Sequence, residues 1–330
     1  MTSSIAWPWE AASQRAQAVA LGILVRLLRR LGPVASSDLG GWIARTIGPA
    51  LPVSRIAQAN LRRALPELDA DARAQVVRAV WDNLGRNGAE LPHLAAIRRS
   101  DAGPGWELQG SEHIEALLRP GAQALFFSGH FGNWEMVLPI AAELGVPVSG
   151  FYRAASNRHV DRIIQAMRER ALGARVSMFA KGAQGARAAL RHLGRGGSLG
   201  LLVDQKMNDG IAVPLLGMTA MTAPALAQFA RSFRCPVIPV RVVRLGPARF
   251  RMVCEAPLPV VLTGSRQADI YALTLAMNAT LERWIRADPA SWLWLHRRWP
   301  KPIQNDLRSG LPGGSSRSTH QDGSPCTTRR

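Results

Sequence analysis

The sequence predicts an α/β fold in which a mostly parallel central sheet is flanked by helices and preceded by a helical N-terminal region. Two observations support this fold class. After the Gly103-Pro104-Gly105 break, short apolar runs alternate with segments of helical periodicity, as expected for parallel strands joined by crossover helices. Before that break, residues 10–100 are rich in Ala and Leu with Arg interspersed, and prolines separate the stretches, which is typical of consecutive helices.

The individual elements follow from the same two patterns. We expect strands at residues 122–128, 146–152, 175–179, 198–203, 236–243 and 250–255. We expect helices at residues 134–144, 157–172, 183–193, 223–233 and 268–287. In the N-terminal region, residues 71–97 form the longest periodic segment and predict a helix with one apolar stripe, which Pro92 interrupts.

The chain of 330 residues is long enough for one large or two modest domains. We expect a membrane-associating helix at residues 1–31, a helical region at 32–104, the α/β domain at 105–304 and a disordered basic tail at 305–330. The tail is assigned because Gly, Ser, Thr and Arg dominate beyond Ser309, a composition too polar to form a core.

The charge of the chain limits its partners. Its 41 Lys and Arg exceed its 23 Asp and Glu, for a net charge of +18, so nucleic acid, an anionic membrane or an acidic protein would attract it. The contents of 47% hydrophobic and 19% charged residues exclude wholesale disorder and a collagen-like chain. Three cysteines give no disulfide framework and indicate a reducing compartment.

A membrane-spanning segment is not evident, because no run of about 18 apolar residues occurs. Residues 16–25 are free of charge between Arg15 and Arg26, and Trp7 and Trp9 precede them. An aromatic end, an apolar body and a basic flank are typical of a helix lying in the interface of an anionic bilayer. The alternative is an ordinary amphipathic helix packed on its own domain.

The first strong strand ends in a turn with the residue types of an active site. Gly129 and Gly132 flank His130, and Glu135 follows five positions after the histidine. In open α/β sheets, ligands bind beyond the carboxyl ends of the strands, and glycines let the backbone approach a ligand closely. His130 is therefore a candidate general base with Glu135 as the acid that orients it. The alternative is a structural histidine followed by a capping Asn133 and a surface glutamate.

Two other kinds of site find less support. Residues 196–200 match GxSxG, but that motif requires the serine after a strand and before a helix, whereas Ser198 precedes its expected strand. The sequence contains no HExxH or comparable metal-binding cluster among its seven histidines. We therefore expect no metal.

The histidine turn and its surroundings resemble a known family. Residues 126–135, Phe-Phe-Ser-Gly-His-Phe-Gly-Asn-Trp-Glu, closely resemble the HX4D/E block of the bacterial lipid A biosynthesis acyltransferases, which belong to the lysophospholipid acyltransferase superfamily. Weaker resemblances follow in the family's order at residues 60–67, 151–153, 199–205, 213–217 and 294–299, and the likeness extends over roughly residues 5–302. The chain departs from the family pattern at Ala154, Leu215-Leu216 and Pro300, and the leucine pair leaves the acyl chain length unassigned.

The resemblance implies a glycerolipid-acyltransferase-like fold and an activity. The activity is transfer of a fatty acyl group from acyl carrier protein to a hydroxyl of a lipid A precursor, at the cytoplasmic face of the inner membrane. His130 is then the base and Glu135 orients it, while Arg153 and Arg170 contact the substrate and Asp204 organises the site. A surface arginine and a helix-capping aspartate are the alternatives for Arg153 and Asp204.

The resemblance also implies the partners. They are acyl carrier protein, the lipid acceptor and anionic inner-membrane lipids, and no cofactor is needed because the thioester is already activated. Near the C-terminus, Arg297 and Arg298 are expected to meet anionic headgroups, with Trp292, Trp294 and Trp299 at the membrane interface. The alternative for these tryptophans is a buried cluster.

Three rival functions remain at this level. An enzyme of the same fold can acylate another glycolipid or an aminolipid. A thioesterase or a non-catalytic membrane protein fits the same composition. A nucleic-acid-binding protein is disfavoured, because it needs a reading module or a basic stripe with interleaved aromatic residues, whereas the arginines here are spread along the whole chain.

Overall fold

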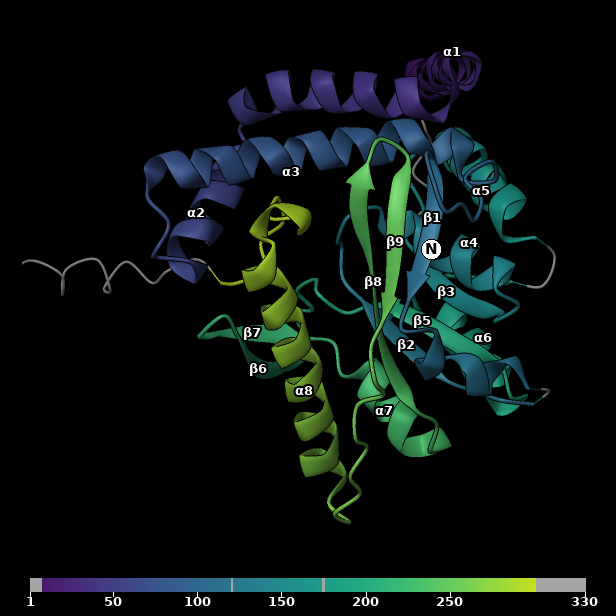
Figure 1. Ribbon diagram of the computed structural model, residues 1–330, viewed down its shortest axis with the longest axis vertical. Helices are drawn as coiled ribbons and strands as arrows, with labels where there is room; N and C mark the ends of the chain where they lie inside the picture. Colours follow the sequence, from purple (N-terminus) through teal and green to yellow (C-terminus); the bar gives the residue numbers. More distant parts are fainter. Residues whose placement is uncertain (1–7, 120, 174–175, 301–330) are drawn as a thin grey trace, which may run out of the picture. The chain divides into compact units, whose positions relative to one another are not determined.

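A central sheet with the strand order β1-β9-β8-β2-β5-β3-β4 organises the α/β part of the computed structural model (Figure 1). The structure describes residues 8–119, 121–173 and 176–300. Parallel pairing joins β1 to β9, β2 to both β8 and β5, and β3 to both β5 and β4, whereas β8 and β9 are antiparallel. The predicted fold class, a mostly parallel sheet flanked by helices, is therefore confirmed.

The elements follow the sequence in a regular order. The sheet strands are β1 (Gly105–Gln109), β2 (Leu125–Ser128), β3 (Val148–Tyr152), β4 (Met178–Ala180), β5 (Ser198–Leu202), β8 (Val237–Gly246) and β9 (Arg249–Cys254). The helices are α1 (Pro8–Ile47), α2 (Ser54–Ala64), α3 (Ala70–Glu90), α4 (Val137–Glu143), α5 (Arg158–Leu172), α6 (Ala183–Gly194), α7 (Ala225–Phe233) and α8 (Arg266–Ala287). Each strand and helix expected in the α/β part has its counterpart, although the boundaries shift by a few residues.

Both faces of the sheet are buried, as the continuous apolar runs of its strands require. Side chains alternate along β2: Leu125 and Phe127 belong to a core shared with α2, α3, α6, α7 and α8, whereas Phe126 belongs to a second core shared with α4. This alternation follows from the two-residue period of a strand. Because β2 and β5 lie inside the sheet, each has a neighbouring strand on both sides.

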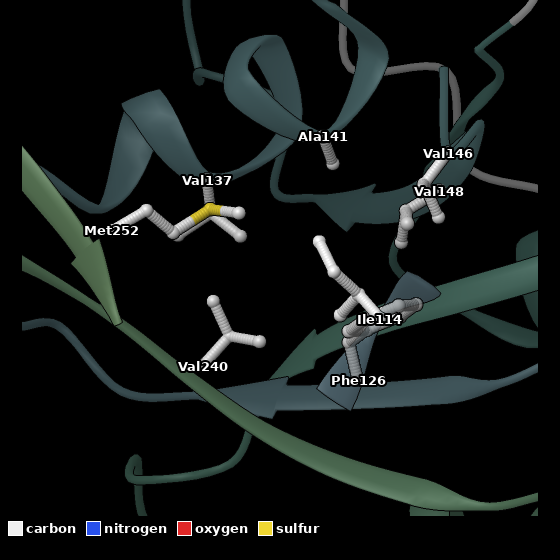
Figure 2. A pocket seen from close by; sticks show the side chains of 8 residues that line it. All are labelled: Ile114, Phe126, Val137, Ala141, Val146, Val148, Val240 and Met252. Carbon is white, nitrogen blue, oxygen red and sulfur yellow. The ribbon is translucent and has the colours of Figure 1, made fainter. Parts of the chain in front are cut away.

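A small apolar gap remains in the second core, between α4 and the sheet (Figure 2). Its volume is about 20 Å³, and its lining is entirely apolar, with Val137 and Ala141 of α4 facing Phe126 and Val240 of the sheet. Ligand pockets are usually at least about 300 Å³. The gap is therefore a packing defect and holds no substrate in this conformation.

Two strand features were missed in the sequence. Strand β1 lies directly after Gly103-Pro104, where we expected a domain boundary and no strand. Strands β6 (Ile211–Leu215) and β7 (Met218–Thr222) form an antiparallel hairpin. The turn between them has positive φ at both Leu216 and Gly217, as a tight hairpin requires. A leucine in this conformation gives no turn signal, so the hairpin could not be predicted.

Helix α1 is kinked and exposes a long apolar surface. Gly32 has non-helical φ and ψ and Pro33 follows it, so two helical halves meet there. In the first half, Val19, Ile23 and Leu27 are each at least half exposed and recur every four residues, so they share one face. In the parts of the chain that the structure describes, no helix combines the length and apolar character needed to cross a membrane.

Several expectations concern residues outside the described part. Trp7 and the tail at residues 305–330 lie beyond it, and the side chain of Trp9 is not described. Nothing in the structure tests the expected membrane contact of these tryptophans or the state of the tail.

Candidate active site

The candidate site is built by the register of two neighbouring parallel strands. Ser128 at the end of β2 is paired with Leu202 at the end of β5, and the two residues are 74 positions apart in the sequence. The same offset joins His130 and Asp204, two residues beyond the strands. The backbone pairing continues past the strand ends, since the Val203 N–H donates to the Ser128 carbonyl at 2.9 Å. Histidine and aspartate are therefore held opposite each other by the sheet itself.

Asp204 is fully buried and accepts three hydrogen bonds. His130 Nδ1 donates to Oδ1 at 2.8 Å, and the His130 backbone N–H donates to Oδ2 at 2.8 Å. Trp292 Nε1 donates to Oδ2 at 2.7 Å. A short bridge between Phe131 and Trp292 brings the C-terminal segment beside the turn. The three donors fix both oxygens of the carboxylate, and with them the orientation of the imidazole.

The charges of the pair stabilise each other. Burial alone would raise the pKa of Asp204, but attraction to His130 and the hydrogen bonds from it hold that pKa well below its ordinary value. Burial alone would lower the pKa of His130, but Asp204 raises it above the ordinary value, with a smaller contribution from Glu135. Asp204 is therefore ionised, and its charge stabilises the imidazolium that forms when His130 accepts a proton.

The other ring nitrogen of His130 is the one available for chemistry. Because Nδ1 carries the hydrogen donated to Asp204, Nε2 has a free lone pair. Its contact is with the exposed side chain of Gln205, whose amide nitrogen lies 3.3 Å away. Trp134 packs edge-on against the ring at a centroid distance of 5.0 Å. This geometry suits a general base, because an exposed side chain is in contact with the lone pair that would accept the proton.

Neither glycine of the turn could carry a side chain without a steric clash. A Cβ atom on Gly129 would lie 2.7 Å from the Phe131 ring and 3.1 Å from the Asp204 carboxyl carbon. A Cβ atom on Gly132, where φ is +49°, would lie 2.1 Å from the Val242 carbonyl oxygen. The glycines therefore allow the backbone to approach other parts of the protein closely, and their predicted approach to a substrate stays a prediction.

Helix α3 anchors the turn through a buried polar network. Asn83 and Asn87 both donate to the Gly132 carbonyl, at 2.9 and 2.6 Å. Glu90, which is fully buried, accepts from the Asn133 side chain at 2.7 Å and forms a two-pronged ion pair with Arg244 of β8. A buried charge of this kind is tolerated only when it is paired and fully hydrogen-bonded. The network ties the turn to α3 and to the sheet at once.

Glu135 differs from its expected role. Its carboxylate receives two hydrogen bonds from Arg168 of α5, at 2.9 and 2.6 Å, whereas Asp204 occupies the Nδ1 side of His130. The expectation that Glu135 directly orients His130 is therefore wrong in this structure. The reason is topological: Glu135 lies in the helical turn that begins at Trp134, while Asp204 is in register with the histidine. Glu135 acts on His130 through its charge and on Arg168 through contact.

The other predicted site residues have different positions. Asp204, predicted to organise the site, is in contact with His130. Arg153 follows β3 directly and is exposed at the same edge of the sheet. Arg170 is exposed and lies two residues after Arg168 on α5, a rotation of about 200° around the helix. Because Arg168 faces Glu135, Arg170 points away from it, and the structure does not bring Arg170 to the site.

The C-terminal motif forms a buried cluster. Trp292, Trp294 and Trp299 are buried and pack against one another. Arg298 is also fully buried and donates to the Met221 carbonyl and to Thr222 Oγ1 at 2.8 and 2.7 Å, so the expectation that it meets lipid headgroups is wrong. Arg297 is exposed. The buried alternative for the tryptophans is the correct one.

Sequence reasoning missed Arg168, Trp292 and Gln205. Gln205 follows Asp204 immediately, and the signal for it was its position beyond a strand end. Arg168 and Trp292 gave no such signal, because their contacts depend on how α5 and the C-terminal segment pack. Among the described residues, no group of three or more His, Cys, Asp or Glu side chains is arranged to hold a metal ion.

Comparison with known proteins identifies the family of the chain. The sequence matches the family profile described as "Bacterial lipid A biosynthesis acyltransferase" over residues 11–301. A search of curated proteins finds no match. Among solved structures, the 1-acyl-sn-glycerophosphate acyltransferase PlsC of Thermotoga maritima matches at 13% sequence identity with a TM-score of 0.37, covering 76% of this chain and 96% of that one. On the family match, which spans most of the sequence and includes the histidine turn, the chain belongs to the bacterial lipid A biosynthesis acyltransferase family and is an acyltransferase.

Proposed function

We propose that this acyltransferase moves a fatty acyl chain from an acyl carrier protein thioester to a hydroxyl of a lipid A precursor, with His130 as the general base. One observation carries the assignment of the base. Nδ1 of His130 is bound to the ionised Asp204, so Nε2 keeps a lone pair at the carboxyl edge of the sheet. An alcohol is a poor nucleophile near neutral pH and needs such a base in contact.

The reaction follows in two steps. The acceptor hydroxyl takes the place of the Gln205 amide at Nε2 and gives its proton to His130 while its oxygen attacks the thioester carbonyl. The tetrahedral intermediate then expels the thiolate, which recovers the proton from His130, so an ester and a free thiol result. Asp204 stabilises the imidazolium between the two steps. We assign Arg153, which is exposed just beyond the end of β3, to the acidic parts of the substrates.

Two further features support the proposed partners. The net charge of +18 favours an acidic donor protein and an anionic lipid surface. The exposed apolar face of the first half of α1 is what a helix lying on the cytoplasmic face of the inner membrane requires. We therefore propose that this half of α1 lies in the membrane interface and brings the site to its lipid acceptor.

The reaction can be tested with purified protein, acyl carrier protein thioester and a lipid A precursor. Mass spectrometry should detect a precursor heavier by one acyl chain, formed only when both substrates are present. Release of free fatty acid without any acceptor would identify a thioesterase instead. Acylation of a different glycolipid or aminolipid, with the lipid A precursor left unchanged, would contradict the assigned acceptor.

Changing Asp204 to asparagine should shift the pH dependence of transfer. His130 must be neutral to accept a proton, so activity falls as the pH drops through its pKa, which Asp204 raises. Without that negative charge the pKa of His130 falls, and the acidic limb of kcat/KM moves to lower pH. The maximal rate also falls, because an amide does not stabilise the imidazolium.

Glu135→Gln is the matched control, since Glu135 contributes less than Asp204 to the raised pKa of His130. Its acidic limb should move in the same direction by a smaller amount. An unchanged limb in Asp204→Asn would mean that the titrating group is not His130.

A further inference from the structure

An open groove of about 520 Å³ lies in the helical region, outside the site described above. Residues 55, 58, 59 and 62 of α2 line one wall, and residues 73, 74 and 77 of α3 line another. These α2 positions form one helical stripe, whereas Ala57, Leu61 and Ala64 on another face of α2 are buried in the core. One face of α2 therefore packs in the core, and the groove lies along a different face of the same helix.

The walls of the groove are strongly basic. Arg55, Arg62 and Arg73 line it, and no lining residue carries a carboxylate. Arg55 and Arg62 are exposed and form no ion pair with any residue in the described part of the chain. Arg73 donates one hydrogen bond to the Leu68 carbonyl and keeps further N–H groups free. Three guanidinium groups around one opening repel each other unless an anion lies between them.

Two arginines elsewhere in this helical region have carboxylate partners. Arg45 pairs with Asp82 at 2.6 Å, and Arg86 pairs with Asp38 and Asp82 at 2.8 and 2.6 Å. The lining of the groove contains no carboxylate that could pair with its arginines in this way. Guanidinium groups bind phosphate oxygens in a two-pronged geometry, so a phosphate is the anion that best matches this set.

The rim of the groove is apolar on one side. Pro49 and Leu51 line it, and Leu51 is 40% exposed. Ile43 and Ile47 lie one helical turn apart at the end of α1 and are 42% and 55% exposed, and the short turn Gly48–Ala50 joins this end of the helix to Leu51. Figure 1 shows the end of α1 and helix α2 at the same end of α3. A phosphate site that borders an exposed apolar strip matches a molecule with an anionic head and an apolar tail.

We propose that the groove binds the phosphate headgroup of an anionic membrane lipid, while Ile43, Ile47 and Leu51 contact its acyl region. A soluble phosphate would use the guanidinium groups but leave the apolar strip uncovered, so the lipid is the better match. The assignment deepens the proposed membrane association and rests on it, but it is independent of the transfer chemistry. It adds a second contact, beyond the Gly32 kink, to the one on the first half of α1.

The test compares two double variants that lose the same charge. Arg55→Gln/Arg62→Gln removes two groove arginines, and Arg187→Gln/Arg191→Gln removes two exposed arginines of α6. Vesicle co-sedimentation uses equal parts of phosphatidylglycerol and phosphatidylcholine, with phosphatidylcholine alone as the neutral surface. At about fivefold per basic residue, the groove variant should bind the anionic vesicles about 10–30-fold more weakly. The α6 variant should bind nearly as tightly as the unmodified protein.

Other outcomes would overturn the assignment in different ways. Equal weakening in both variants would mean general charge attraction without a site. Tight binding of inorganic phosphate or glycerol phosphate, with vesicle binding unaffected by the groove variant, would mean a site for a soluble anion. A higher KM for the acyl carrier protein thioester, with vesicle binding unchanged, would mean a protein-docking surface.

The experiment also separates failure of this site from failure of the proposed function. If the unmodified protein bound neither type of vesicle, the membrane association itself would fail. If it bound anionic vesicles and the groove variant bound them equally well, only the groove assignment would fail. Transfer to a detergent-dispersed acceptor should be unchanged in both variants, which shows that each is folded.

Discussion

Replacing His130 by alanine should lower the rate of acyl transfer by about 10²–10⁴-fold, the usual contribution of a positioned general base. The loss follows from the geometry of the imidazole. Among the described side chains, no other ring is held by a buried carboxylate at one nitrogen while its second nitrogen keeps a lone pair. The drop should appear mainly in kcat, because the imidazole acts on the proton that moves during the reaction. Transfer from acyl carrier protein thioester to the lipid acceptor is the measurement.

His113→Ala is the matched control. His113 lies near β1, with Nε2 3.6 Å from the carboxylate of the exposed Glu112, and has no contact with the Asp204 carboxylate. This variant should transfer at close to the original rate. Circular dichroism should show both variants folded, and near-full activity in a folded His130→Ala protein would rule out this base.

Replacing Glu90 by alanine should destabilise the fold by about 3–5 kcal/mol, the range for breaking a buried ion pair by removing one partner. Arg244 would keep its charge in a largely buried position, and the side chains of Ser37 and Asn133 would lose their acceptor. The free energy of unfolding in urea is the measurement. The variant should also transfer acyl groups poorly, because the turn that carries His130 would lose one of its links to α3, the hydrogen bond between Asn133 and Glu90.

Asp38→Ala supplies the comparison for this prediction. Asp38 is 55% exposed and pairs with Arg86 at the surface, so its removal should cost less than about 1 kcal/mol. Glu90→Gln retains the shape of the side chain, so it should be more stable than Glu90→Ala and allows activity to be measured in a folded protein. Equal stability of Glu90→Ala and Asp38→Ala would show that the network contributes no more than a surface pair.

The sequence was sufficient for the parts of the molecule that depend on short-range patterns. The apolar run before Ser128, the glycine-flanked turn and the following helix are contiguous, so they located His130 at a strand end. Successive strands and helices also predicted the sheet, because each has its own periodicity. Strand order was not predicted, since it depends on pairing between distant segments.

The partner of the histidine shows where sequence reasoning fails. Glu135 is close in sequence and was given the role that belongs to Asp204, which is 74 residues away. Only the parallel register of β2 and β5 brings that carboxylate to the ring. Leu216 shows a second kind of failure: its positive φ contradicts its intrinsic preference, and the hairpin is held in part by a hydrogen bond from its backbone to Glu282 at 2.7 Å.

The hydrogen bond from Trp292 to Asp204 has a consequence for protein synthesis. The ribosome makes the histidine turn and β5 long before it reaches Trp292, and the emerging chain can form the sheet only with this carboxylate short of one donor. The third hydrogen bond to this carboxylate therefore forms only after all seven strands of the central sheet have been made.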